Sequence, residues 1–176
     1  KVLITGAGSY IGTSFEHYLT EHYPGMYDVC TVDMRSDGWR NMAFRGYDVV
    51  FHVAGIAHIK ETDKNAELYY KVNRDLTVEC AKKALSEQVP HFVFLSSMSV
   101  YGMNSGRIIK ETEPSPTTNY GKSKLEAEND LNILANQFPN TFTVAILRPP
   151  MIYGKGCKGN YNALKKIALS VPLFPD

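Results

Sequence analysis

The sequence predicts an α/β fold in which helices cover both faces of a doubly wound parallel sheet. Short segments are almost continuously apolar, which is typical of strands that are buried on both faces. Between them lie segments whose apolar residues recur at helical spacing, and a glycine-rich turn joins the first strand to the first helix. Strands that alternate with amphipathic helices in this way form a parallel sheet.

The predicted strands follow the chain in order at residues 1–5, 27–32, 48–54, 91–95 and 142–147. Each is a run of mostly apolar residues, and the first ends in a Gly-Ala-Gly turn. Ligands of such sheets bind beyond the carboxyl ends of the strands, so the distinctive residues at those ends predict the site. These residues are Gly6, Asp33, Ala54, Gly55, Ser96, Ser97, Arg148 and Pro149.

The predicted helices occupy residues 11–22, 64–88, 119–138 and 160–170. The first ends before Pro24-Gly25, a pair that does not continue a helix. The second carries apolar or small residues at helical spacing, namely Leu68, Val72, Leu76, Cys80 and Ala84. Residues 34–47 are polar and contain glycine, and they predict no regular element.

The composition favours one globular domain of ordinary size. The chain has 176 residues, a formal net charge of +1 and 44% hydrophobic residues, which gives no reason to expect nucleic acid as a partner. Its three cysteines, Cys30, Cys80 and Cys157, are scattered and support neither a disulfide framework nor a metal site, so a reduced cytoplasmic location is expected. No apolar run approaches the roughly 20 residues of a membrane span. We expect residues to be missing before Lys1 and, in larger number, after Asp176.

The segment Thr5-Gly6-Ala7-Gly8-Ser9-Tyr10-Ile11-Gly12 predicts a dinucleotide-binding turn rather than an ordinary glycine-rich loop. Glycines between a strand and a helix let backbone amides approach a pyrophosphate. Asp33, at the end of the second strand, can accept hydrogen bonds from ribose hydroxyls and would repel a 2′-phosphate, so NAD is favoured over NADP. Two alternatives stay open, because Arg35 could accommodate that phosphate and Asp33 could merely cap a turn.

The pentapeptide Tyr120-Gly-Lys-Ser-Lys124 is the most informative feature of the chain. A tyrosine and a lysine four residues apart project from the same face of a helix. An ammonium beside a phenol favours the phenolate and brings its pKa down toward the working range of a base. The pattern alone is common on ordinary helix surfaces, but together with a dinucleotide turn it becomes specific.

These residues resemble the extended short-chain dehydrogenase/reductase family, in particular its NAD-dependent epimerase/dehydratase branch acting on nucleotide sugars. The resemblance covers essentially the whole chain. It rests on the dinucleotide turn and the Tyr-Gly-Lys-Ser-Lys pentapeptide, together with the segments at residues 48–55, 72–73, 95–102 and 147–154. It implies a Rossmann-type domain at residues 1–150, followed at 151–176 by the start of a truncated substrate-binding region, and a homodimer.

The resemblance also implies roles for individual residues. Tyr120 matches the family's catalytic acid or base, Lys124 the lysine that lowers its pKa and binds the nicotinamide ribose, and Ser97 the hydroxyl that binds the same sugar oxygen. Asn160 matches an asparagine that contacts the nucleotide diphosphate. The residues implied to bind the cofactor are Gly6, Gly8, Ser9, Tyr10, Ile11, Gly12, Asp33, Ala54, Gly55, Asn73, Tyr120 and Lys124.

The sequence departs from the family pattern at two places. Ser9 stands where the family usually has the middle glycine of its turn, and Met151 lies near a position where galactose epimerases use an asparagine to hold substrate. Sugar-nucleotide 4,6-dehydratases typically have Thr-Asp-Glu where this chain has Ser97-Met98-Ser99, so a dehydratase is disfavoured.

The sequence therefore predicts an NAD-dependent 4-epimerase of a UDP-hexose or UDP-N-acetylhexosamine. One alternative is an NAD(P)H-dependent reductase of a 4-keto nucleotide sugar, which would use the same serine, tyrosine and lysine. The other is a non-catalytic dinucleotide-binding redox sensor, which the retention of Ser97, Tyr120 and Lys124 disfavours. We expect His52, which lies within a predicted strand, to be a hydrogen-bonded core residue rather than a ligand.

Overall fold

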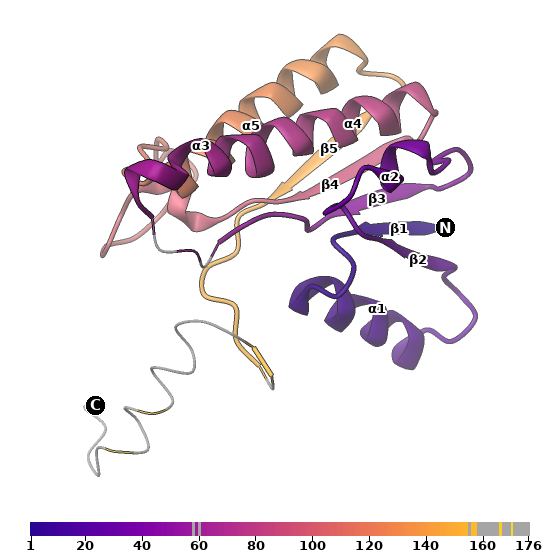
Figure 1. Cartoon of the computed structure of the whole chain (residues 1–176), viewed down its shortest axis with the longest axis horizontal. Coiled ribbons are helices and arrows are strands. Elements are labelled where there is room, and N and C mark those ends of the chain that lie inside the picture. The colour runs from indigo at the N-terminus through magenta and orange to yellow at the C-terminus, as the bar shows by residue number, and fades with distance from the viewer. Residues whose placement is uncertain (58, 60, 155, 158–165, 167–169, 171–176) are drawn as a thin grey trace.

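The computed structural model describes residues 1–57, 59, 61–154, 156–157, 166 and 170, and its core is a five-stranded parallel sheet (Figure 1). The strands are β1 (Val2–Thr5), β2 (Val29–Val32), β3 (Val49–His52), β4 (His91–Leu95) and β5 (Thr143–Leu147). Their order across the sheet is β2-β1-β3-β4-β5. The predicted fold class and the approximate position of every predicted strand are confirmed.

The parallel register places the carboxyl ends of the strands at one edge of the sheet. Thr5 on β1 pairs with Val32 on one side and with His52 on the other, and Leu95 at the end of β4 pairs with Leu147. The chain runs from β1 outward to β2 and then returns to place β3 on the opposite side of β1. A doubly wound sheet has its ligand-binding crevice at such a change of direction.

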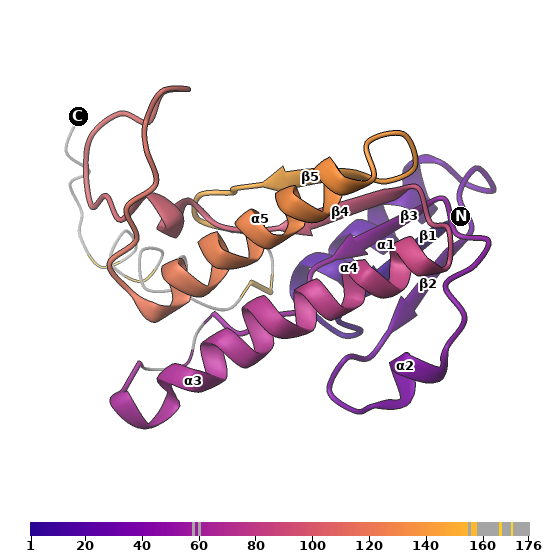
Figure 2. The same cartoon turned by 90° about the horizontal axis from the view of Figure 1, so that it is seen from above.

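Helices lie on both faces of the sheet (Figures 1 and 2). On one face, α1 (Tyr10–His22) packs Phe15 edge-on against Phe51, with the ring centroids 5.0 Å apart. On the other face, α4 (Leu76–Ser86) and α5 (Asn119–Gln137) run side by side. They bury Ala81, Ala84, Ala127 and Leu131 in the main apolar core, together with Phe92 and Phe94 of β4.

The predicted helix at residues 64–88 is a series of helical segments rather than one α-helix. It begins with a 3₁₀ turn (η1, Asp63–Asn65) and continues as α3 (Ala66–Tyr69), a π-helical turn (η2, Tyr70–Asp75) and then α4. The π-helical turn coincides with the full burial of Asn73, whose amide bonds groups outside the helix. Regular spacing of apolar residues continues through the turn, so the sequence does not reveal it.

One further segment differs from the sequence prediction, and for another the structure does not test the prediction. A short helix, α2 (Gly38–Asn41), forms within residues 34–47, where no element was predicted, because Trp39 is buried beside Phe44 in the core. The helix predicted at residues 160–170 falls largely outside the described residues. Among the helices that the structure describes, none is both long enough and apolar enough to cross a membrane.

A tight turn connects β4 to the long segment that returns to α5. The 3₁₀ turn η3 (Met98–Tyr101) follows β4 and ends at Gly102, which has a left-handed φ of 64°. A Cβ atom added at Gly102 would overlap the carbonyl oxygen of Ser115. The residue therefore has to be glycine both for its backbone angle and for the close approach of the returning chain.

We expect Gly102→Ala to lower the free energy of unfolding by more than the roughly 1–2 kcal/mol that a left-handed backbone alone costs. Gly25→Ala is the matched control, since Gly25 also has a positive φ of 75° but faces open space. Equilibrium urea unfolding of the two variants measures the difference. Equal losses would show that the chain near Ser115 moves away readily and imposes no constraint.

Candidate active site

The glycine-rich turn lies where β1 and β3 end side by side. Gly6 has a φ of 92°, and a Cβ atom there would lie 3.1 Å from the backbone nitrogen and Cα of Ala54. Ala54 itself is 7% exposed. The structure thus brings together two predicted site residues that are far apart in the sequence, and any side chain at Gly6 would push the ends of the two strands apart.

Ser9, the departure from the family's glycine pattern, is the N-cap of α1. Its hydroxyl oxygen accepts a hydrogen bond from the Gly12 amide at 3.1 Å, as capping serines do. A Cβ at Gly12 would meet this hydroxyl at 2.8 Å and Val53 at 3.2 Å, so Gly12 allows the helix to lie close to β3. Tyr10 and Ile11 begin the helix, where amides have no intrahelical acceptor and the helix dipole favours an anion.

Asp33 follows β2 directly, and its carboxylate is held by Arg35. The backbone amide and Nε of Arg35 both donate to Asp33 Oδ1 at 2.9 Å, and the guanidinium also donates to Oδ2. These bonds lower the pKa of Asp33 to about 2, so the carboxylate is ionised. Residue spacing predicted the place of Asp33 but not its bidentate pairing with Arg35.

Tyr120 and Lys124 lie on the first turns of α5, whose N-cap is Thr118. Lys124 is only 5% exposed, and its Nζ donates to the carbonyl oxygen of Leu95 at 2.9 Å and lies 4.6 Å from the ring centroid of Phe94. Burial lowers the pKa of Lys124 to about 8, while the Glu128 carboxylate acts in the opposite direction.

Ser97 and Tyr120 meet at the end of β4. Ser97 is the N-cap of η3, and its hydroxyl bonds both the amide and the hydroxyl of Ser99 at 3.1 Å. Burial raises the pKa of the Tyr120 phenol, whereas the neighbouring Ser97 hydroxyl lowers it. The net direction is opposite to the effect that the sequence led us to expect from the Lys124 ammonium, which here is directed at Leu95.

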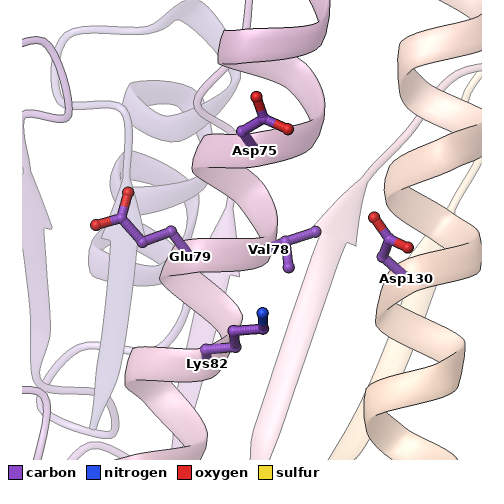
Figure 3. A pocket seen from close by; sticks show the side chains of 5 residues that line it. All are labelled: Asp75, Val78, Glu79, Lys82 and Asp130. Atoms are coloured by element: carbon purple, nitrogen blue, oxygen red, sulfur yellow. The ribbon is translucent and has the colours of Figure 1, made fainter.

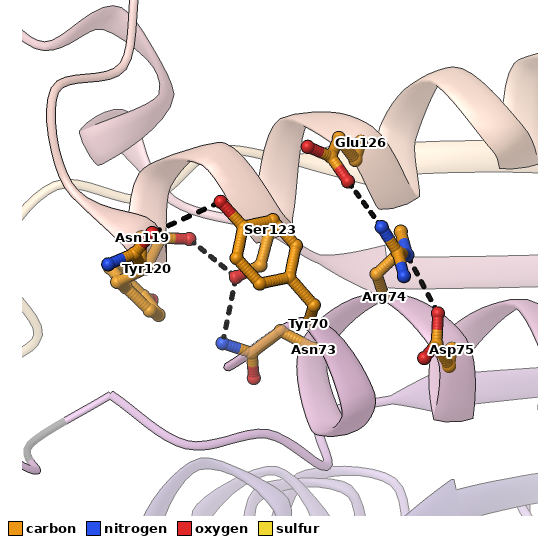
Figure 4. Close-up of polar contacts among 8 residues, drawn as sticks. All are labelled: Tyr70, Asn73, Arg74, Asp75, Asn119, Tyr120, Ser123 and Glu126. Carbon is orange, nitrogen blue, oxygen red and sulfur yellow. Dashed lines mark hydrogen bonds and ion pairs between the residues drawn. The ribbon is translucent and has the colours of Figure 1, made fainter. Parts of the chain in front are cut away.

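Asn73 connects the loop after β3 to α5 (Figure 4). Its Oδ1 accepts from the Ile56 amide at 2.9 Å, and its Nδ2 donates to the Ile56 carbonyl at 3.0 Å and to the Ser123 hydroxyl at 3.3 Å. Ser123 in turn donates to the carbonyl of Tyr120 at 2.9 Å. A Cβ at Gly55 would lie 3.0 Å from Asn73 Oδ1 and 3.3 Å from Lys124 Nζ, so these three predicted residues pack closely against one another.

His52 is the centre of a buried polar chain behind this site, and the expectation of a hydrogen-bonded core residue is confirmed. Its Nδ1 lies 2.8 Å from the Thr5 hydroxyl, and its Nε2 lies 3.0 Å from the Thr77 hydroxyl. Thr77 uses its single proton to bond the Asn73 carbonyl, so Nε2 has to donate and Nδ1 has to accept. Burial lowers the pKa of His52 to about 3, and the ring is neutral.

Sequence reasoning missed Thr5 and Thr77 as partners of this histidine. The partners lie 47 and 25 residues away from His52. A polar residue at the end of an apolar strand indicates that a partner exists, but the sequence does not say which residue it is. Asn160 lies outside the described residues, and Met151 lies on the chain after β5 with 46% of its surface exposed.

A separate hollow of about 290 Å³ lies on the outer side of α4 and α5 (Figure 3). Its lining residues are Asp75, Val78, Glu79, Lys82 and Asp130, none of which is a predicted site residue. Over the described part of the chain, no group of three or more His, Cys, Asp or Glu side chains is placed to hold a metal ion.

Comparison with known proteins agrees with this arrangement. The model of the NAD dependent epimerase/dehydratase family matches residues 2–171. A UDP-glucose 4-epimerase of Vibrio cholerae is 30% identical over 198 residues, an alignment that covers 98% of this chain and 58% of the relative. An N-acetyl-alpha-D-glucosaminyl-diphospho-ditrans,octacis-undecaprenol 4-epimerase of Escherichia coli O157:H7 is 30% identical over 182 residues, covering 96% of this chain and 54% of the relative.

A solved structure gives the same match in three dimensions. MoeE5 in complex with UDP-glucose and NAD superposes with a TM-score of 0.78 at 25% sequence identity, over 90% of this chain and 56% of that one. The chain therefore spans just over half the length of the relatives that it matches.

The burial of neutral His52 predicts a pH dependence of stability. Because its pKa of about 3 lies below the ordinary value of about 6.5, the unfolded state binds a proton that the folded state excludes. The free energy of unfolding should therefore fall as the pH drops from about 6.5 toward 5, with a slope approaching about 1 kcal/mol per pH unit.

Urea unfolding of the wild type and of His52→Gln across this range measures the slope. We expect the variant to be less stable overall but to lose most of the slope. His17→Gln, which removes an exposed histidine on α1, is the control for the loss of one histidine. An unchanged slope in His52→Gln would contradict the assignment of a neutral, buried imidazole.

Proposed function

The chain belongs to the NAD-dependent epimerase/dehydratase family, and we propose that it forms the cofactor-binding and proton-transferring part of a nucleotide-sugar 4-epimerase. The observation that carries this proposal is the position of Ser97 and Tyr120 beside each other, with buried Lys124 one turn further along α5. All three lie at the carboxyl edge of the sheet, on the same edge as the glycine-rich turn.

The residues at the switch between β1 and β3 fit a dinucleotide. Gly6 and Gly12 keep the turn close to β3, and the first-turn amides of α1 suit a pyrophosphate. The ionised Asp33 would accept the adenosine ribose hydroxyls, which requires Arg35 to turn away from part of the carboxylate. Gly55 has no side chain, which lets Asn73 and the Lys124 ammonium lie close to the strand end where the nicotinamide ribose would bind. NAD, when bound, supplies the hydride acceptor and donor that the protein lacks.

In this proposal the Tyr120 phenolate takes the proton of the C4 hydroxyl of the sugar and later returns it. Ser97 donates a hydrogen bond to the same oxygen and stabilises the charge that develops there. Lys124 favours the phenolate by its positive charge, which has to offset the burial that raises the pKa of Tyr120. NAD held at the glycine-rich turn would serve as both acceptor and donor of the hydride at C4, so 4-epimerisation would consume no reductant.

The proposed substrate is a hexose or N-acetylhexosamine joined to a nucleoside diphosphate, with UDP-glucose and UDP-N-acetylglucosamine as the first candidates. Both curated relatives are named for 4-epimerisation, one of UDP-glucose and the other of an N-acetylglucosaminyl group that a diphosphate joins to undecaprenol. A 4,6-dehydratase is disfavoured because Met98 and Ser99 of η3 offer no carboxyl group for the elimination of water. A homodimer stays a prediction of the family resemblance.

We expect the full-length protein to interconvert each candidate UDP-sugar and its C4 epimer without added cofactor, as measured by NMR. Tyr120→Phe should slow this reaction about a hundredfold or more, because the acid or base is lost. Tyr27→Phe, which alters an exposed tyrosine at the start of the segment that leads into β2, is the matched control.

The same assay separates the alternatives. Turnover only with NAD(P)H and a 4-keto nucleotide sugar would replace the epimerase with the reductase. Full function of the Tyr120→Phe protein would support a non-catalytic sensor.

We also expect Asp33→Asn to weaken NAD binding by about tenfold, since hydrogen bonds to a charged acceptor are the stronger ones. The same change should reduce the preference for NAD over NADP, because it removes a charge that repels the 2′-phosphate. Calorimetric titration of the full-length protein with each dinucleotide measures both effects. Unchanged affinities for NAD and NADP would show that Asp33 only caps a turn and does not contact the ribose.

A further inference from the structure

An ion pair with a buried carboxylate lies one turn beyond the proposed site on α5. Glu128 is 1% exposed, and the spacing of Tyr120, Lys124 and Glu128 places all three on one face of the helix. Arg148, the first residue after β5, donates from Nε to both carboxylate oxygens of Glu128 at 3.0 and 3.1 Å and again from Nη2. The carboxylate is therefore fixed in position by a bidentate partner.

The ion pair joins four elements of the fold. The hydroxyl of Ser96, at the end of β4, donates to Glu128 Oε1. Arg148 Nη1 donates to the phenol of Tyr101 in η3 at 2.6 Å, and the guanidinium lies 5.0 Å from the centroid of that ring. Ser97 lies between Ser96 and η3, so both sides of the proposed catalytic serine are tied to α5 through this cluster.

Packing alone does not explain a charged pair at this place. Burying the Glu128 carboxylate removes its hydration, although the Arg148 side chain stays 29% exposed, and a well-packed apolar pair of similar volume is often as stable or more stable. The pair does have an electrostatic consequence for its neighbour. Lys124 is buried with a backbone carbonyl as the acceptor of its Nζ, and the Glu128 carboxylate counteracts the burial that disfavours its charged form.

We propose that Glu128, held by Arg148, is a positioning residue that keeps the Lys124 ammonium charged and fixes the Ser97 segment against α5. The inference rests on the proposed roles of Ser97, Tyr120 and Lys124. The titratable and charged groups around Lys124 are Tyr120 and Glu128 on its own helix and His52 on β3, with Arg148 and Tyr101 behind Glu128. Glu128 is the anionic group among them, since His52 is neutral and Arg148 is cationic.

Glu128→Gln tests the charge while keeping nearly the same shape. In the full-length protein, NMR of lysine labelled at Cε follows the ionisation of Lys124, whose signal is assigned by its loss in Lys124→Arg. We expect the titration midpoint of Lys124 to fall by about one pH unit in Glu128→Gln, as expected when a neighbouring opposite charge is lost. The NMR titration of Lys124 needs no substrate, so its result remains interpretable if the proposed epimerase activity is absent.

Glu126→Gln is the matched control on the same helix. It removes the carboxylate that accepts a hydrogen bond from Arg74 at 2.7 Å (Figure 4). Arg74 belongs to η2 and is not part of the cluster around Glu128 and Arg148. It should leave both the Lys124 titration and the turnover number unchanged. Where epimerisation is observed, Glu128→Gln should lower the turnover number about tenfold with little change in KM, because positioning acts on the reacting groups and not on substrate affinity.

The double variant Glu128→Gln/Arg148→Gln separates a positioning role from a purely structural one. It leaves no arginine without its carboxylate partner, so it should regain part of the stability that Glu128→Gln loses. The proposal requires the Lys124 midpoint to stay low in this double variant. A wild-type Lys124 titration in a folded Glu128→Gln protein, or its recovery in the double variant, would overturn the proposal.

Discussion

The parallel pairing of β1 with both β2 and β3 is the constraint on which the rest of the site depends. It brings Thr5, Val32 and His52 to one level of the sheet, so the glycine turn, Asp33 and Ala54 emerge next to one another. Gly6 then has to lack a side chain, because a Cβ atom there would lie only 3.1 Å from the Ala54 backbone. The relative positions of the residues proposed to bind a dinucleotide at this edge are therefore set by the register of β1, β2 and β3.

Two buried polar groups connect this sheet edge to the helices, and they do so in different ways. His52 is neutral and links β1 to α4 through threonine hydroxyls. Glu128 is charged and links α5 to the ends of β4 and β5 through Ser96 and Arg148. Because a buried polar group without a partner costs more than its bond contributes, each link resists displacement. The site is therefore anchored to the sheet by polar contacts rather than by apolar packing alone.

The sequence was sufficient for the parts of this arrangement that depend on local pattern. Strand positions follow from apolar runs, and the places of Asp33, Ser97, Tyr120 and Lys124 follow from their spacing relative to strand ends and helix turns. What it could not supply were contacts between distant segments. Tertiary packing of Trp39 creates α2, and the two-point bond of Asn73 to Ile56 accompanies a π-helical turn that apolar periodicity does not record. The role of Ser9 as a helix cap likewise required the position of Gly12.

Burial favours the neutral form of both Tyr120 and Lys124. It raises the pKa of the phenol and lowers the pKa of the ammonium. Each shift by itself opposes the charged form that the proposed proton transfer requires. A phenolate and an ammonium formed together attract each other, and this attraction grows as water is excluded. A fixed anion behind the lysine maintains the ammonium before the phenol loses its proton. The order of charges along α5, from phenol to ammonium to carboxylate, therefore lets a buried lysine remain the charged partner of a weakly acidic tyrosine.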